Sequence, residues 1–424
     1  MSALAPVLRR PPLISSWLPF YYGWVNVLVA ALAMVATLPG RTQGLGLITE
    51  SLLKEFRMEP ATYAQINLWA TLLGSLACVG FGRLIDRLGN RVMMALTILL
   101  LGTVVVGMSQ VTALWALAVA VTLTRAFGQS ALSISSLSVA PQWFGRRLPM
   151  AMAVYSVALT VGFMAAFPGL GHVITQSGWR VAWSGMGWVL VLVVAPLAWA
   201  LIRRSPEACG LEREPTLVPT AVDEAPDFTL RRALVTPYFW VFALASTLYG
   251  LVASGIGLFN ESILAERGFE VSAYHQALAV TALTGLAGNF LGGWLATRWP
   301  LSRLLAGAMA LLAAGLMALP FLKSQNDLWA QSVLMGLAGG LVAVLFFTVW
   351  GRTYGRRHLG QIQGAAQMLT VVGSAVGPLC LAAVVSRTGS YSAAFFGLAA
   401  VVGVVGIAAL WIPIPRSNEM ARKP

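Results

Sequence analysis

Long apolar blocks recur along the whole chain, and their length and spacing determine the possible fold classes. A helix needs about 20 apolar residues to cross the ~30 Å hydrocarbon core of a bilayer. Hydrophobic residues make up 58% of the chain and charged residues only 10%, whereas soluble domains have about 25% charged residues. The alternating segments of about ten residues that a membrane β-barrel requires are absent. The sequence therefore predicts an all-α membrane protein.

The apolar blocks fall into two groups of six. One long polar stretch, residues 203–236, separates the groups and holds four prolines among mixed charges. We interpret it as a flexible cytoplasmic linker between an N-terminal six-helix bundle at 1–202 and a C-terminal six-helix bundle at 237–424. The expected twelve spans are 21–48, 61–82, 91–110, 113–140, 149–172, 181–202, 237–262, 272–296, 301–322, 327–350, 359–385 and 391–413.

Most basic residues lie in the short loops between these blocks. The net charge of +13 would suggest nucleic-acid binding in a soluble protein, but here the basic residues that produce it are concentrated in the loops. If the N-terminus is cytoplasmic, 20 of the 28 lysines and arginines fall on cytoplasmic segments and seven on outer ones, with Arg125 as the remainder. Loops rich in Lys and Arg stay in the cytoplasm. We therefore expect a multi-pass protein of the cytoplasmic (inner) membrane with both termini inside.

Motifs for enzyme chemistry are missing from the loops. The three cysteines, Cys78, Cys209 and Cys380, are scattered and lack metal-ligand spacing. The sequence shows no phosphate-binding loop and no nucleophile constellation. We expect no enzyme activity, no metal or cofactor, and no nucleic-acid partner.

The two groups of six blocks resemble each other. The clearest matches are GLITESLLKE (46–55) with GLFNESILAE (257–266), GRL (82–84) with GWL (293–295), and WFGRR (143–147) with TYGRR (353–357), at offsets of 211, 211 and 210. Six-helix repeats in the same orientation imply a pseudo-twofold axis along the membrane normal. We therefore expect two pseudo-symmetric bundles with a central site between them.

The loop between the second and third spans carries the motif GRLIDRLGNR at 82–91. It resembles the signature loop of the major facilitator superfamily, G-x-L-x-D-R-x-G-R-[RK], with Asn90 at a position that is usually basic. In that family the aspartate pairs with cationic groups and a helix end, and so latches the two halves in one state. The second copy has Thr297 in place of the acid. The residues that the resemblance assigns to gating are Gly82, Asp86, Arg87, Gly89 and Arg91.

The fourth span adds to this resemblance. Its Arg125 and Gly128 resemble the arginine–glycine signature that the superfamily carries there. The Trp-Phe-x-Arg-Arg segment that follows, Gly-Trp-Arg at 178–180 and Tyr-Tyr-Gly-Trp at 21–24 are similar to the prokaryotic monocarboxylate and oxalate–formate branch. The resemblance implies the superfamily fold, in which spans 1, 4, 7 and 10 line a central cavity.

Arg125 is a lone charge well inside an apolar run, at a depth near the middle of the membrane. An isolated cation there costs at least ~2.5–3.5 kcal/mol. None of the 15 acidic residues lies deep in a span, and Glu50 and Glu261, near the outer ends, come closest. Arg125 therefore either bonds to backbone carbonyls, Gln129 or Ser133, or lines a wet cavity and binds an anionic ligand. A planar guanidinium suits a carboxylate.

Arg41 is the second candidate for the central site. It lies within PGRTQG at 39–44, where the first span should loosen, and interrupted spans point to transporter sites. The alternative is an arginine of the outer interface that snorkels to water. Other polar residues in the spans either face the cavity or only join helices. Those that we assign to substrate binding, besides the two arginines, are Gln129, Tyr155, Tyr249, Asn289 and Gln363.

Together these observations predict a secondary active transporter of the major facilitator type. We expect it to rock two halves around a cavity and to carry a small organic anion, a monocarboxylate, held by Arg125 with help from Arg41. An efflux pump for neutral or cationic amphiphilic compounds is one alternative, and a non-transporting receptor with the same fold is another. The expected partners are the lipid bilayer and a small-molecule substrate, and the expected oligomeric state is a monomer.

Overall fold

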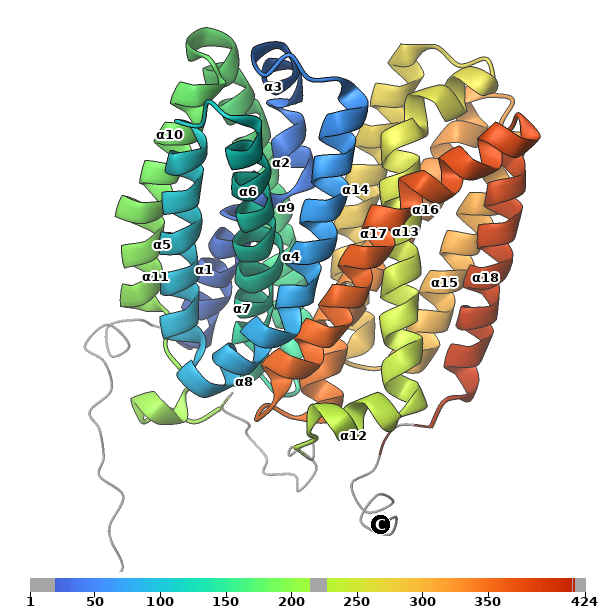
Figure 1. Ribbon diagram of the computed structural model, residues 1–424. Helices are drawn as coiled ribbons and strands as arrows, with labels where there is room; N and C mark the ends of the chain where they lie inside the picture. The colour runs from blue at the N-terminus through green and yellow to red at the C-terminus, as the bar shows by residue number, and fades with distance from the viewer. Residues whose placement is uncertain (1–19, 214–226, 414, 416–424) are drawn as a thin grey trace, which may run out of the picture.

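The computed structural model describes residues 20–213, 227–413 and 415, and all regular elements in these ranges are helical (Figure 1). The N-terminal bundle consists of α1 (Gly23–Val35), η1 (Leu38–Gly40), α2 (Thr42–Gly46), α3 (Thr49–Glu55), α4 (Pro60–Leu88), α5 (Asn90–Met108), α6 (Leu114–Thr124), η2 (Arg125–Leu132), α7 (Ser133–Leu137), α8 (Val139–Trp143), α9 (Leu148–Ser177), α10 (Trp179–Val189), η3 (Leu190–Val194) and α11 (Ala195–Leu201).

Two short helices follow in the linker region, and the C-terminal bundle comes after them. These elements are η4 (Glu207–Cys209), α12 (Leu230–Val235), α13 (Pro237–Glu266), α14 (Val271–Ala296), α15 (Leu301–Ala318), η5 (Leu319–Phe321), α16 (Gln325–Tyr354), α17 (Leu359–Thr388) and α18 (Ser392–Trp411). In the described residues, 11 helices are long and apolar enough to cross a membrane, and α1 is a shorter apolar helix. The prediction of twelve membrane-spanning helices is confirmed.

The first span is broken rather than continuous over 21–48. Its α-helix ends at Val35, and η1 and the short helices α2 and α3 follow it. Pro39 cannot donate a backbone hydrogen bond, and Gly40 adds backbone freedom. The loosening that we expected at 39–44 is therefore a full interruption. Spans 4 and 6 remain helical but pass through π-helical segments, η2 and η3.

The bundles meet through five long helices. In Figure 1, α17 runs diagonally, beside α4 at the lower end of the molecule and away from it toward the upper end. On the other side, α9 packs against α14 and α16. The "linker end" is the end that carries the α4–α5 turn at Gly89, the linker and the end of α18. The opposite end, with α3 and the α9–α10 turn at Gly178, is the "far end".

The two bundles are in close contact at the linker end. A Cβ built on Gly82 of α4 would lie 2.3 Å from the backbone oxygen of Gly360 on α17. On the other side of the molecule, a Cβ on Gly293 of α14 would lie 2.5 Å from the Cβ of Ala153 on α9. Real Cβ atoms do not approach other atoms this closely, so glycine is required at both positions. Gly82 and Gly293 are also the repeat-related pair found in the sequence.

Candidate functional site

Arg125 begins the π segment η2, and its side chain is only 2% exposed. Nη1 donates to the backbone oxygen of Gly40 (3.2 Å) and to Oγ1 of Thr42 (3.0 Å). It also donates to Oε1 of Gln129 (3.0 Å), while Nη2 donates to Oδ1 of Asn67 on α4 (3.0 Å). Neutral oxygens from spans 1, 2 and 4 therefore surround the charge. Arg125 forms no ion pair with any carboxylate in the described residues.

Spans 1 and 4 touch beside this arginine. A Cβ on Gly40 would lie 2.2 Å from the backbone oxygen of Thr124, and one on Gly128 would lie 3.1 Å from Cα of Gly40. A side chain at Gly40 would thus push span 1 away from span 4. The close approach brings the carbonyl oxygen of Gly40 within reach of Arg125, so the break in span 1 supplies an acceptor for the buried charge.

Arg41 lies just before α2 and is half-buried. Its Nε donates to Oγ1 of Thr37 (2.6 Å), and its Nη2 contacts Sδ of Met34 (2.8 Å) and Oγ of Ser133 (3.4 Å). The guanidinium carbon lies 5.6 Å from the ring centroid of Phe163 on α9, a cation–π contact. Nη1 makes no hydrogen bond among the described residues. The Arg41 side chain is therefore directed toward α7 and α9, and a thioether is a weak acceptor.

The two arginines bond neighbouring turns of span 4. Arg125 bonds to Gln129, and Arg41 bonds to Ser133 four residues later. Glu50 is exposed on α3, and the side chain of Glu261 lies outside the described residues. Two positive charges in a poorly hydrated interior, without a described counter-charge beside them, create a potential that favours an anion.

Tyr155 connects this region to the other bundle. It is fully buried on α9, and its hydroxyl lies 2.7 Å from Oγ of Ser136, which donates to the backbone oxygen of Ala30 (2.6 Å). Its ring meets that of Phe347 on α16 edge to face, with centroids 5.5 Å apart. Tyr155 is thus held at the contact between the bundles.

The remaining predicted site residues lie in the C-terminal bundle. Tyr249 of α13 is half-buried against Gly339 of α16. Asn289 of α14 is 7% exposed and its Oδ1 has no partner, while Gln363 of α17 is 1% exposed and neither of its polar atoms has a partner in the described residues. No hydrogen bond in the described chain joins these three side chains to Arg41 or Arg125.

Asp86, in the last turn of α4, reaches across to the start of α17. Its Oδ1 accepts from the N–H of Gly360 (2.8 Å), and its Oδ2 accepts from the N–H (3.1 Å) and Nε2 (3.0 Å) of Gln361. The first N–H groups of a helix have no partner within the helix, and the helix dipole favours a negative charge there. The carboxylate therefore caps α17 of the opposite bundle.

A family model described as Major Facilitator Superfamily matches residues 29–330 and 242–424. The chain belongs to the major facilitator superfamily. It is 26% identical to human Monocarboxylate transporter 11 over 414 residues, covering 93% of this chain and 82% of that protein. It is also 24% identical over 297 residues to the "Uncharacterized 38 kDa protein in 23S RNA operon" of Thermoproteus tenax, covering 69% of this chain and 72% of that protein.

Solved structures show the same superfamily fold. The human organic anion transporter MFSD10 (TETRAN) superposes with a TM-score of 0.66 at 17% identity, covering 92% of this chain and 98% of that one. The transporter FucP in its outward conformation superposes with a TM-score of 0.64 at 14% identity, with the same coverage. Members of this superfamily are transporters, so the prediction that the chain is not an enzyme is confirmed.

Within the superfamily loop, only some of the predicted gating residues contact the other bundle. Gly82 and Asp86 do so, whereas Gly89, with φ of +83°, ends α4. Nε of Arg91 donates to the backbone oxygen of Trp199 in its own bundle (2.9 Å), and the guanidinium lies over that ring. Arg87 lines a neighbouring hollow and forms no described hydrogen bond. Gating by these residues stays a prediction.

Several contacts of the arginines were missed from sequence. Thr37 lies four residues before Arg41, a helical spacing that could have suggested the hydrogen bond. Phe163 offers no such signal, because its contact with Arg41 depends on how α9 packs against span 1.

Proposed function

We propose that this protein is a secondary active transporter that moves a small organic anion, a monocarboxylate, by alternating access between its two bundles. The half-buried guanidinium of Arg41 carries the proposal. It lies at the break in span 1, its described partners are all neutral, and its Nη1 is uncommitted. A carboxylate would replace weak contacts with charge-assisted hydrogen bonds.

Arg41 and Arg125 take different roles in this proposal. Arg125 is 2% exposed and already makes four hydrogen bonds, so it holds the break in span 1 and adds positive potential. Arg41 contacts the substrate. The sequence alone could not show which arginine contacts the substrate, because neither arginine has an acidic residue at its depth in the spans.

The named relatives support the substrate class. One sequence relative is a monocarboxylate transporter, and one structural neighbour is an organic anion transporter. The distribution of basic residues supports a linker end in the cytoplasm, so that contact between the bundles there corresponds to a state open to the outside. We place the protein in the inner membrane, with cytoplasmic termini, as a monomer.

Uptake of labelled monocarboxylates into proteoliposomes tests the proposal. We expect Arg41→Ala to reduce uptake at low substrate concentration by about tenfold or more, because charged hydrogen bonds contribute about 1.5–3 kcal/mol each. Arg41→Lys should retain part of it, since the charge remains without the planar fork. Val252→Ala, at the repeat-related position, is the matched control and should transport normally.

Undiminished uptake by Arg41→Ala would overturn the assignment of Arg41. An efflux pump for cationic amphiphiles would show itself differently, as growth protection against such compounds with no uptake of monocarboxylates. The positive potential around the two arginines opposes that alternative.

A further inference from the structure

The linker is attached to both bundles at the linker end. Nη2 of Arg213 donates to the backbone oxygen of Phe144 at the end of span 4 (2.7 Å). At the other end of the linker, Oδ1 of Asp227 accepts from the backbone N–H groups of Arg356 and Arg357, both at 3.1 Å. One described part of the linker therefore follows the N-terminal bundle and the other follows the C-terminal bundle.

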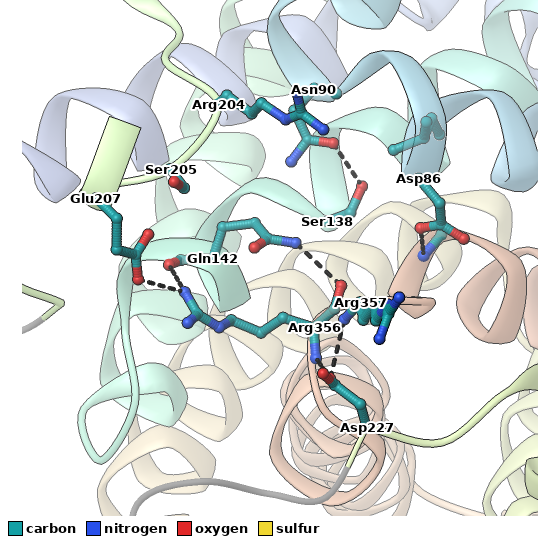
Figure 2. A pocket seen from close by; sticks show the side chains of 13 residues that line it. Asp86, Asn90, Ser138, Gln142, Arg204, Ser205, Glu207, Asp227, Arg356 and Arg357 are labelled. Carbon is teal, nitrogen blue, oxygen red and sulfur yellow. Dashed lines mark hydrogen bonds and ion pairs between the residues drawn. The ribbon is translucent and has the colours of Figure 1, made fainter. Parts of the chain in front are cut away.

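Arg356, in the turn between α16 and α17, lies where the bundles and the linker meet (Figure 2). Its Nη1 donates to the backbone oxygen of Gln142 on α8 (3.0 Å) and to Oε1 of Glu207 (3.1 Å). Nε2 of Gln142 donates in return to the backbone oxygen of Arg356 (3.3 Å). These side chains line a cavity of about 360 Å³, and Asp86 also lies in its wall.

The pair of Glu207 and Arg356 is ionic. The pKa of the Glu207 carboxyl is lowered. Burial alone would raise the pKa, but hydrogen bonds from Ser205 and from the backbone of Glu207 itself lower it. The charge of Arg356 and its hydrogen bond lower the pKa further, and together these contributions outweigh burial. The two side chains are 52% and 31% exposed, so solvent screens their attraction. The pair alone is weak, and the two Gln142 bonds add to it.

Opening the linker end would break some of these bonds and spare others. The bonds from Asp227 to the backbone of Arg356 and Arg357 stay within the C-terminal bundle and its end of the linker. The bond from Arg213 to Phe144 stays with the N-terminal bundle. The bonds from Arg356 to Gln142 and Glu207 join opposite sides, so they must break when the bundles separate.

We propose that Gln142, Glu207 and Arg356 form a second latch that stabilises the closed linker end, separate from the contact of Asp86 with α17. We call it the linker clasp. Through Glu207 the linker takes part in the gate and does more than tether the bundles. The proposal depends on the two-bundle architecture of the superfamily and not on the substrate proposed above.

The sequence repeat provides a matched control for the clasp. Arg146 stands at the position in the N-terminal bundle that corresponds to Arg356, at the offset of 210. It is exposed and makes no hydrogen bond or ion pair in the described residues. Neutralising Arg146 changes the charge of the same end of the molecule without touching the clasp.

Distances between spin labels at the linker end test the proposal on the full chain in nanodiscs. Leu88→Cys and Trp299→Cys place one label on each bundle at exposed positions. Cys380→Ser removes the exposed native thiol, and Cys78 and Cys209 are buried. Pulsed electron resonance then gives the populations with short and long distances, and thermal unfolding confirms that each variant folds.

We expect Glu207→Gln to raise the open-to-closed ratio about two- to fivefold, the range that a half-exposed ion pair supports. Arg356→Gln should raise it about tenfold, because it also loses the bond to Gln142. Combining Glu207→Arg with Arg356→Glu should bring the ratio back toward that of the unmodified protein, and Arg146→Gln should leave it unchanged. The proposal is overturned if Glu207→Gln has no effect, or if Arg146→Gln shifts the ratio as much as Arg356→Gln.

Discussion

The N-terminal bundle holds two guanidinium groups among its spans, whereas the C-terminal bundle has Val252 and Met335 at the positions that match Arg41 and Arg125 at offsets of 211 and 210. The backbone differs in the same way. Span 1 is broken and span 4 contains a π segment, but α13 and α16 are uninterrupted helices of 30 residues each. The charges and the irregular backbone occur together because the break supplies Gly40 and Thr42 as acceptors.

The contact between the bundles shows the opposite pattern. Gly82 and Gly293 occupy matching positions and each allows a close approach to the other bundle. Both repeats therefore share the packing that closes the linker end, whereas Arg41 and Arg125 have apolar counterparts in the other half. A scaffold with symmetric packing can thus hold an asymmetric arrangement of charges.

Methionine, the residue at the matching position of the C-terminal bundle, should be strongly destabilising in place of Arg125. Arg125→Met leaves the oxygens of Thr42, Gln129 and Asn67 without their donor. We expect a loss of about 2–4 kcal/mol in the free energy of unfolding, measured as a lower melting temperature in detergent. Met335→Leu is the control and should change little. An unchanged melting temperature would show that Arg125 does not stabilise the break.

Adding a methyl group at either of the matched glycines, Gly82 and Gly293, should destabilise the closed linker end. Gly82→Ala and Gly293→Ala should each weaken the closed linker end by about 1–3 kcal/mol through overpacking. That cost changes the open-to-closed ratio by about 5- to 150-fold.

Spin labels on the linker end measure this ratio. Gly80→Ala on the same helix is the control, since a Cβ there meets nothing within 4 Å. If only one of the two matched variants opened the linker end, the two packing contacts would not be equivalent.

Asp86 and Thr297 occupy the same position in the two copies of the motif. We expect substitutions at these residues to change the stability of the closed linker end less than the glycine substitutions do. Asp86→Asn keeps the shape but loses the negative charge at the start of α17, which should cost about 1–2 kcal/mol of closed-state stability. Thr297→Ala should have no effect, because the Thr297 hydroxyl bonds within its own helix to Trp294 (2.7 Å). Equal effects of the two variants in the spin-label assay would contradict an asymmetric latch.

The smallest expected effect concerns Glu55 at the far end, which matches Glu266. Burial raises the pKa of the Glu55 carboxyl, but hydrogen bonds from Arg180 and Trp179 and the Arg180 charge outweigh burial and lower it. A lowered pKa in the folded state means that the stabilisation is present near neutral pH and is lost as the pH falls through that pKa.

Glu55 is 39% exposed, so the loss should stay below about 1 kcal/mol. Melting curves from pH 7 down to acid conditions should show a small acid-induced decrease that Glu55→Gln lacks. A decrease of the same size in the variant would exclude Glu55 as its origin.

Much of the fold follows from local sequence. Apolar blocks of membrane length predict the spans, and PGRTQG at 39–44 predicts where span 1 is interrupted. The depth of Arg125 and the absence of deep acids leave two possibilities, a cation that bonds to neutral groups and a cation that binds an anionic ligand, and only the folded structure shows its four neutral partners. The glycine and aspartate of the 82–91 motif, through its resemblance to the superfamily, predict which loop approaches the other bundle.

Other features depend on packing between distant segments. The bond from Arg125 to Asn67 joins spans 2 and 4, and no periodicity reveals which faces of the two helices meet. The linker composition predicts flexibility, but Glu207 and Asp227 find partners at the α16–α17 turn that only the folded arrangement supplies. The π segment in span 4 was not expected, because its residues have no distinctive composition.

That π segment sets the rotation of the second half of span 4. A π turn accommodates an additional residue, so the residues after Leu132 are turned by about 100° from the direction that an unbroken α-helix would give them. Ser136 thereby meets the backbone of Ala30, and Ser138 meets Asn90. If residues 125–132 formed a regular α-helix without losing a residue, every later side chain of the span would turn away from its partner; deleting one of these residues removes the additional one, so a regular α-helix would then keep those partners.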